Sequence, residues 1–176
     1  FYGKGNKIEF KVDGDAKPIL RYPHRKEDAL TGCVTVYEGP YKNSQDQVPH
    51  NLYLVCHDPY GQNQSADSSS LGAAYVIKSV NNISRPDDLI VASYVGRPHS
   101  QDEYNRNLFM LADYYNAKIG FENDRGAVIH YAKQHRKLHK LQEEFEMLDK
   151  KDLRSKNVKR QYGMHTTEAR KRQGEL

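Results

Sequence analysis

Hydrophobic and polar positions alternate in the first part of the chain and then give way to continuous apolar runs. Residues 7–22 carry apolar side chains at alternate positions around a turn sequence, Asp13-Gly14, and this pattern predicts a β-hairpin. Residues 33–41 predict another short strand that ends at a Gly-Pro pair. The chain therefore begins with short β elements.

The polar residues 42–50 separate these elements from a more regular pattern, so we expect residues 1–49 to form an N-terminal β-hairpin appendage and linker. Residues 52–57 are a continuous apolar run, typical of a strand covered on both faces. Residues 71–80 and 87–97 predict two further strands. Their short connections favour an antiparallel three-strand meander.

Helical spacing begins at Ser100, with Glu103 three positions later in a capping-box pattern. The apolar face of this helix consists of Tyr104, Leu108, Leu111, Ala112 and Tyr115. Residues 117–124 predict a fourth strand, and a second helix is expected from Gly126 through residue 141. This order predicts an α/β domain over residues 50–176, with a mixed sheet of a meander plus a parallel strand, flanked by helices.

Composition restricts the class of protein. The chain has 176 residues, which suffice for one domain, and no apolar run approaches the length of a membrane span. Two cysteines without a metal-binding spacing suit a reducing compartment. No signal peptide opens the chain, and its first residue is Phe1 instead of methionine, as expected of a fragment or a processed product.

The net charge of +4 is concentrated in the C-terminal part, where residues 133–140 and 150–172 are rich in Lys and Arg. Such a basic flank beside acidic residues is the charge layout of an enzyme that acts on a polyanion, although a solvated helix face or an exposed charged tail has the same composition. The expected DNA-binding residues are Lys133, Arg136, Lys137, Lys156, Lys159, Arg160, Arg170, Lys171 and Arg172.

Two carboxylates follow predicted strands: Asp58 ends the first and Glu122 the fourth. If these strands are neighbours, both carboxylates emerge at one sheet edge, where oxygen ligands suit Mg²⁺ or Mn²⁺. Asp67 ends the next polar loop and is a candidate third ligand, while Asn123 and Asp124 are candidates to contact metal-bound water or a phosphate. A strand-end Asp is also a common turn residue, so spacing alone leaves both interpretations open.

The runs "LYLVCHDPYG…SADSSSLGAAYVI", "DLIVASYVGR" and "LADYYNAKIGFENDRG" resemble the nuclease domain of tailed-phage terminase large subunits. The later "QYGMHTTEARKR" resembles that family's Tyr-Gly-x-x-Thr-Thr segment. The resemblance spans about residues 50 to 172. It implies a ribonuclease H-like fold and a metal-dependent endonuclease that cuts concatemeric viral DNA during genome packaging.

In that pattern Asp58, Asp67 and Glu122 are catalytic metal ligands for Mg²⁺ or Mn²⁺, with two ions expected in the complete protein. A third catalytic Asp usually follows the Thr-Thr segment; the printed sequence has none there, so we expect a domain truncated at its C-terminus. The implied partners are double-stranded DNA, an upstream packaging ATPase domain, the portal and the small terminase subunit. The resemblance implies no interaction with a membrane. The implied location is the cytoplasm of a bacterial host, for a phage or prophage protein.

Two other functions remain open: a ribonuclease H-like resolvase or transposase, and a non-catalytic DNA-binding or motor-docking module. The histidines His130, His135 and His139 are expected on the second helix, where the last two have i, i+4 spacing, but a basic surface explains them better than zinc. His57 is expected to pack on the face opposite Asp58, and Cys56 is expected in the core.

Overall fold

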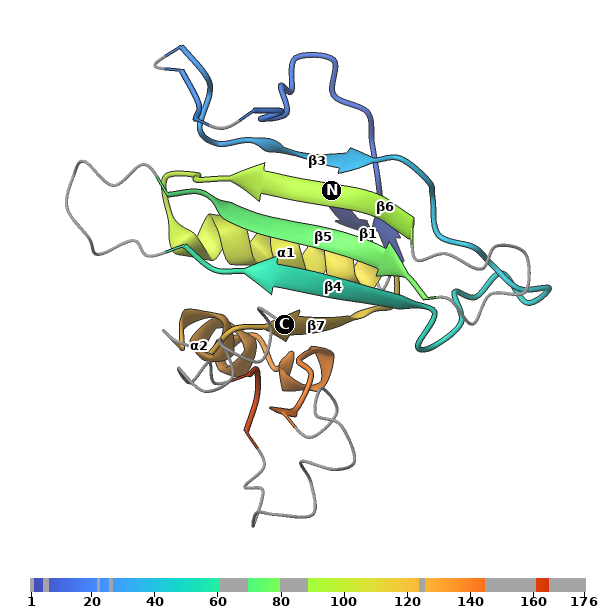
Figure 1. Cartoon of the computed structure of the whole chain (residues 1–176). Coiled ribbons are helices and arrows are strands. Elements are labelled where there is room, and N and C mark those ends of the chain that lie inside the picture. Colours follow the sequence, from blue (N-terminus) through green and yellow to red (C-terminus); the bar gives the residue numbers. More distant parts are fainter. Residues whose placement is uncertain are drawn as a thin grey trace, which may run out of the picture.

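The computed structural model describes residues 2–4, 7–21, 23–25, 27–60, 70–79, 89–123, 126–144 and 161–164. Their central feature is a five-stranded sheet with the strand order β3-β6-β5-β4-β7 (Figure 1). The strands are β3 (Cys33–Val36), β4 (Tyr53–Asp58), β5 (Gly72–Lys78), β6 (Leu89–Gly96) and β7 (Lys118–Phe121).

The sheet is mixed. Strands β4, β5 and β6 form an antiparallel meander, and β3 adds to β6 antiparallel. Strand β7 pairs with β4 in parallel, because the chain crosses behind the sheet in helix α1 (Gln101–Tyr114) before it returns (Figure 1). The predicted α/β class, with a meander plus a parallel strand, is confirmed at this level of detail.

Helix α1 begins where the capping pattern places it. The Ser100 hydroxyl accepts a hydrogen bond from the Glu103 N–H at 3.1 Å, which satisfies one of the unpaired donors of the first turn. The helix ends at an αL residue, Asn116, with φ of 48°. The Ala117 N–H then donates to the Ala112 carbonyl at 2.8 Å, the bond that closes a Schellman motif.

The core lies between α1 and one face of the sheet, and Tyr104 is at its centre. Its ring is stacked on Tyr94 of β6, with centroids 4.7 Å apart, and on His57 of β4, at 5.4 Å. Tyr60 meets the same ring edge-on at 5.3 Å. Four aromatic side chains, from α1, β6, β4 and the loop that follows β4, thus fix how the helix crosses the sheet.

The predicted hairpin over residues 7–22 is wrong in its strands. The hydrogen-bonded pair is β1 (Tyr2–Lys4) with β2 (Lys7–Glu9), and described residues 10–21 contain no strand. A turn does form at the predicted place, since the Ala16 N–H donates to the Asp13 carbonyl at 3.3 Å. Phe10 packs against Tyr114 of α1, with ring centroids 6.3 Å apart, so its apolar side chain serves helix packing.

Strand β3 lies within residues 1–49, the expected appendage, but it is paired with β6 at the edge of the main sheet. The segment therefore contributes directly to the central sheet. The division of the chain at residue 50 stays a prediction.

The second helix is shorter than predicted. Helix α2 (Ala127–Gln134) ends before Arg136, which has a φ of 55°, and a short 3₁₀ helix, η1 (Leu138–Lys140), follows. The Lys137 N–H donates to the Ala132 carbonyl at 2.7 Å, again closing a Schellman motif. No glycine marks this end, because an arginine occupies the αL position.

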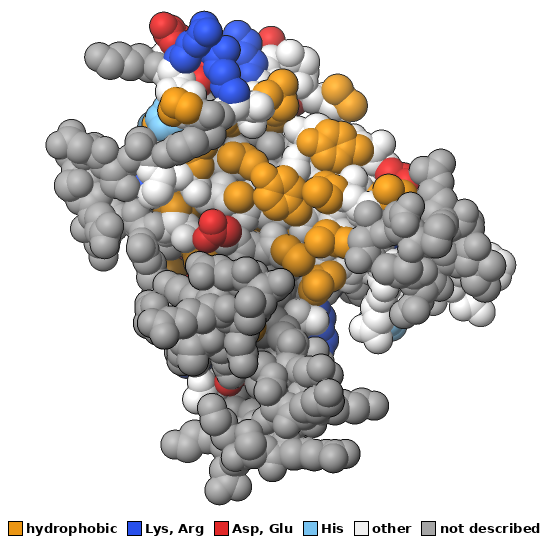
Figure 2. Space-filling view, viewed as in Figure 1, with side chains coloured by type: hydrophobic (Ala, Val, Ile, Leu, Met, Phe, Trp, Pro, Cys, Tyr) orange, Lys and Arg blue, Asp and Glu red, His pale blue; other side chains and the backbone are white. Residues whose placement is uncertain are grey.

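In the described part of the chain, no helix covers the sheet face opposite α1, which we call the open face (Figure 1). Figure 2 shows hydrophobic side chains gathered across the middle of this face. The exposed members from the strands and their ends are Tyr37, Tyr75 and Ile90. Helix α1 packs on the other face (Figure 1).

Candidate active site

The two strand ends that carry Asp58 and Glu122 lie side by side. Strands β4 and β7 are parallel, and the last pair in their register is His57 with Phe121. Asp58 and Glu122 are the next residue on each strand, so both stand at one edge of the sheet. Because side chains alternate along a strand, both project on the face opposite His57 and Phe121. The structure thus brings together the two acids that the sequence singles out.

Asp58 and Glu122 line one hollow of about 560 Å³ on the open face, which we call the Asp58 pocket. Its other described lining residues are Leu54, Cys56, His57, Ala73, Tyr75, Gly120, Phe121, Gln142 and Met164. Within the described lining, the two carboxylates are the only charged groups. The pocket therefore has the negative charge and oxygen donors that a hard cation requires.

Glu122 is held by a later part of the chain that lies beside the end of β7. The Met164 N–H donates to the Phe121 carbonyl, and the Asn123 N–H donates to the Met164 carbonyl, each at 2.9 Å. The Asn123 side-chain amide adds a bond to the Tyr162 carbonyl at 2.9 Å. Glu122 is thus flanked by backbone bonds on both sides, which fixes the position of its Cα.

Gly163 makes this close approach possible. Its φ is +74°, and a Cβ at this position would lie 2.8 Å from the ring of Phe121 and 2.9 Å from the Cβ of Asn123. Any larger residue would push the segment away from β7. The Tyr162-Gly163 pair, part of the sequence motif, therefore lies next to Glu122.

His57 lies on the other side of the sheet from Asp58, as predicted. Its side chain is buried, and Nδ1 lies 3.1 Å from the Ala73 carbonyl, which can only accept, so Nδ1 carries the proton. Burial lowers the pKa of His57 to about 4, against the opposing effect of the Ala73 hydrogen bond. His57 is therefore a neutral packing residue at neutral pH.

Cys56 shares the face of Asp58 and lines the same pocket. Its side chain is only partly buried, so the expectation of a core residue is wrong: the face on which it lies is open. Burial nevertheless raises the pKa of the thiol, which keeps it in the neutral form at neutral pH.

Several predicted site residues lie outside the described residues. They are Asp67, Asp124, Lys156, Lys159, Arg160, Arg170, Lys171 and Arg172. Among the described candidates for DNA contact, Lys133 and Arg136 are exposed at the end of α2. Lys137 is engaged within the chain, where its Nζ lies 2.5 Å from a carboxylate oxygen of Asp113.

The structure separates the histidines that were expected on one helix. His130 is exposed on α2, His135 caps the end of that helix and stacks on Tyr131 at 4.1 Å, and His139 lies in η1. The i, i+4 geometry is lost because the helix ends at Gln134. Within the described part of the chain, no three His, Cys, Asp or Glu side chains gather as a metal site.

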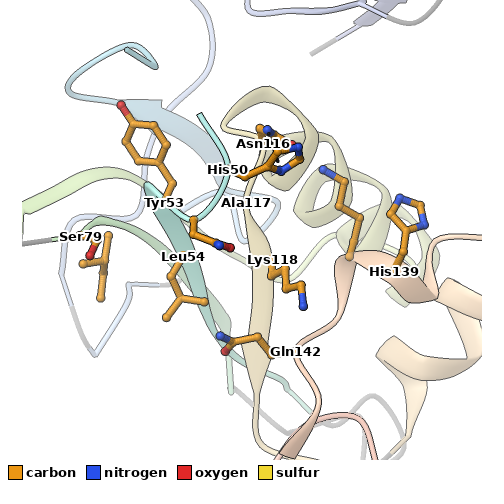
Figure 3. Close-up of a pocket in the computed structure, with 12 residues that line it drawn as sticks. His50, Tyr53, Leu54, Ser79, Asn116, Ala117, Lys118, His139 and Gln142 are labelled. Atoms are coloured by element: carbon orange, nitrogen blue, oxygen red, sulfur yellow. Dashed lines mark hydrogen bonds between the residues drawn. The ribbon is translucent and has the colours of Figure 1, made fainter. Parts of the chain in front are cut away.

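Sequence reasoning missed a second pocket at the other end of β4 and β7, which Figure 3 shows in close-up. Its basic side chains are His50, Lys118, His139 and Lys140. They come from three segments of the chain, and of these only His139 and Lys140 lie in the basic run of residues 133–140 that the sequence singles out. Only the residue spacing along β7, with Lys118 four positions before Glu122, relates this pocket to the acids.

No protein-family model matches the chain, and no curated protein matches it. No helix in the described ranges is both long and apolar enough to cross a membrane. The family resemblance therefore rests on the motifs in the sequence, and the chemistry must be argued from the Asp58 pocket.

Proposed function

We propose that this chain is a metal-dependent DNA endonuclease domain of the kind found in phage terminase large subunits, with a ribonuclease H-like fold. One observation carries the proposal: the parallel register of β4 and β7 sets Asp58 and Glu122 at adjacent strand ends on one face. Two carboxylates that the fold holds in one pocket repel each other, and a bound divalent cation removes that repulsion.

The residues present fit Mg²⁺ or Mn²⁺. Mg²⁺ is commonly bound by one or two carboxylates, and waters and substrate phosphates complete its shell. The Asp58 pocket offers two carboxylates on rigid strands and no described cationic side chain in its lining. When bound, such ions activate a water molecule and stabilise the leaving oxygen of a phosphodiester. Asp67, outside the described residues, is the candidate for an additional ligand.

The remaining role of the protein is to position and admit the substrate. Asp58 stands at the exposed end of β4, and Glu122 is fixed by the bonds of its neighbours to the Tyr162–Met164 segment. The pocket lies on the sheet face opposite α1 (Figure 1). The proposed partners in packaging, an ATPase domain, a portal and a small subunit, follow from the resemblance alone.

A non-catalytic DNA-binding or motor-docking module is the second candidate. It is favoured by the fact that, in the described ranges, only two carboxylates meet in the Asp58 pocket. Such a module binds DNA but shows no metal-dependent cleavage. A resolvase or transposase, in contrast, cleaves four-way junctions or DNA ends in preference to plasmid.

Cleavage of supercoiled plasmid with Mn²⁺ separates these functions. We expect nicking by the protein, and a loss of at least about 100-fold in Asp58→Asn and in Glu122→Gln, because even residues hydrogen-bonded to a metal ligand contribute 10- to 100-fold. Asp46→Asn is the matched control: this carboxylate is exposed, pairs with Lys42, and lies outside the Asp58 pocket.

Equal nicking by the wild type and both pocket variants would contradict the proposal. Absence of any nicking, with DNA binding intact, would favour the docking module. A four-way junction cleaved in preference to plasmid would favour a resolvase.

A further inference from the structure

An exposed aromatic side chain lies beside the two acids. Tyr75 of β5 is 39% exposed and lines the Asp58 pocket together with Asp58 and Glu122. The core tyrosines Tyr94 and Tyr104, in contrast, are buried and stacked on each other. Within the described part of the chain, Tyr75 has no ring contact and its hydroxyl has no hydrogen bond. The ring is therefore available to a ligand.

The neighbours of Tyr75 across the sheet leave space on one side of its ring. Residues directly opposite on adjacent strands share a face. Tyr75 is opposite Cys56 of β4, and Cys56 is opposite Gly120 of β7, so this side carries one small side chain and none beyond it. On the other side Tyr75 is opposite Ser93, whose hydroxyl is hydrogen-bonded to the Tyr37 hydroxyl at 2.9 Å. The space is thus on the β4 side, where the pocket with the two acids lies.

The Asp58 pocket has a charged end and an apolar part that adjoin each other. Cys56 and Gly120 precede Asp58 and Glu122 by two positions on the same two strands. Because residues two positions apart lie on the same side of a strand, the acids border directly on the space beside the Tyr75 ring. The pocket volume of about 560 Å³ is within the range of pockets that hold small-molecule groups.

A nucleotide has the same division into a charged part and an apolar part. A divalent cation at the two carboxylates attracts a phosphate. The flat base of the same nucleotide can stack on a tyrosine ring, and such stacking accepts every base. Bases inside a duplex are already stacked and paired, so only an unpaired base can present its face to Tyr75.

We infer that Tyr75 stacks on an unpaired base of the DNA strand whose scissile phosphate lies at Asp58 and Glu122. This inference rests on the proposed function for the choice of DNA as the ligand. It narrows the substrate to DNA whose two strands are separated at the point of cleavage. Tyr75 is a positioning residue, since its ring contacts the base and not the reacting phosphate.

A fluorescence titration of Tyr75→Trp tests this contact directly. The sequence contains no tryptophan, so the introduced indole is the sole tryptophan fluorophore. In EDTA and at low salt, we expect saturable quenching by a single-stranded oligothymidylate, because a base stacks on the indole. An abasic oligonucleotide of the same length has the phosphates but no bases and should leave the fluorescence unchanged. A fully paired hairpin should bind more weakly than the single strand.

Anisotropy of a fluorescein-labelled oligothymidylate, also in EDTA, measures the affinity. We expect Tyr75→Ala to bind about 5- to 150-fold more weakly, the effect of losing one base stack. The slope of log K against log salt should stay unchanged, because no phosphate contact is removed. Tyr75→Phe keeps the ring and should keep the affinity. Tyr41→Ala is the matched control, since it removes an exposed tyrosine outside the pocket.

Equal affinity of the wild type and Tyr75→Ala would overturn the inference, as would equal quenching by the abasic oligonucleotide or tighter binding of the hairpin. Because these assays contain no divalent metal, they do not depend on cleavage. Base stacking without any Mn²⁺-dependent nicking would keep the base site and reject the nuclease. Nicking by a protein whose DNA affinity is unaffected in Tyr75→Ala would reject the base site and keep the nuclease.

Discussion

His57 shows how strongly one position depends on the side of the sheet that it faces. It is adjacent to Asp58 in sequence, yet its ring lies against Tyr104 in the core. Alternation along the strand was enough to predict this separation. What the sequence could not show is the hydrogen bond to Ala73, because that partner is 16 positions away on β5.

The buried neutral imidazole predicts a pH dependence of stability. The pKa of His57 is about 4 in the folded protein, below the ordinary 6.5, so between these values the unfolded chain binds the additional proton. The contribution of neutral His57 to the unfolding free energy is therefore fully present above pH 6.5 and is lost as the pH falls towards 4. From pH 7 to pH 5 the loss is about 2 kcal/mol.

Urea unfolding at both pH values measures this effect. His57→Phe keeps an aromatic ring but has no titrating group, so we expect its loss of unfolding free energy between pH 7 and pH 5 to be about 2 kcal/mol smaller than in the wild type. Identical pH profiles for the two proteins would show that His57 is not the group responsible.

At the scale of elements, the sequence predicted beginnings better than ends. Ser100 and Glu103 located the start of α1 because a capping residue acts through local backbone bonds. The end of α2 was missed because Arg136 occupies the αL position after the helix. This position is usually occupied by glycine or asparagine, which would have indicated the helix end in the sequence. The strands of the predicted hairpin were wrong because an alternating apolar residue can also pack against a helix instead of pairing in a sheet. Phe10 does so against Tyr114 of α1.

The contact between β5 and α1 gives a prediction at this scale. A Cβ on Gly72 would lie 2.7 Å from ring atoms of both Tyr104 and Tyr60. Tyr104 is fully buried and stacked, so it cannot move aside without disturbing the core. We expect Gly72→Ala to lower the unfolding free energy by about 1–3 kcal/mol, the usual cost of overpacking.

Gly14→Ala is the matched control for this substitution. Gly14 lies in an exposed turn, and a Cβ there would meet no atom within 4 Å. Urea denaturation should therefore show little change in Gly14→Ala. Equal stability of the two variants would mean that the tyrosine rings do not confine β5.

At the scale of the whole molecule, the sequence predicted the types of strand but not their complete order. The meander follows from short connections between consecutive strands. The addition of β3 to β6 could not be foreseen, because it joins positions about 60 residues apart and no local pattern says which strand β3 pairs with. The sequence did not predict that β4 and β7 are neighbours. The predicted metal site was made conditional on that pairing.

That pairing now supports the central claim, that Asp58 and Glu122 hold a divalent cation together. The alternative is that the two carboxylates act independently. Each carboxylate alone binds Mn²⁺ weakly, whereas two in one pocket bind it as a unit. Metal affinity should therefore depend on both residues at once.

Calorimetric titration of the protein with Mn²⁺ tests this most directly. We predict saturable binding by the wild type and by Asp46→Asn, and a loss of at least about 100-fold in affinity in both Asp58→Asn and Glu122→Gln, with little further loss in the double variant. Mn²⁺ affinity that survives either single substitution would contradict the account.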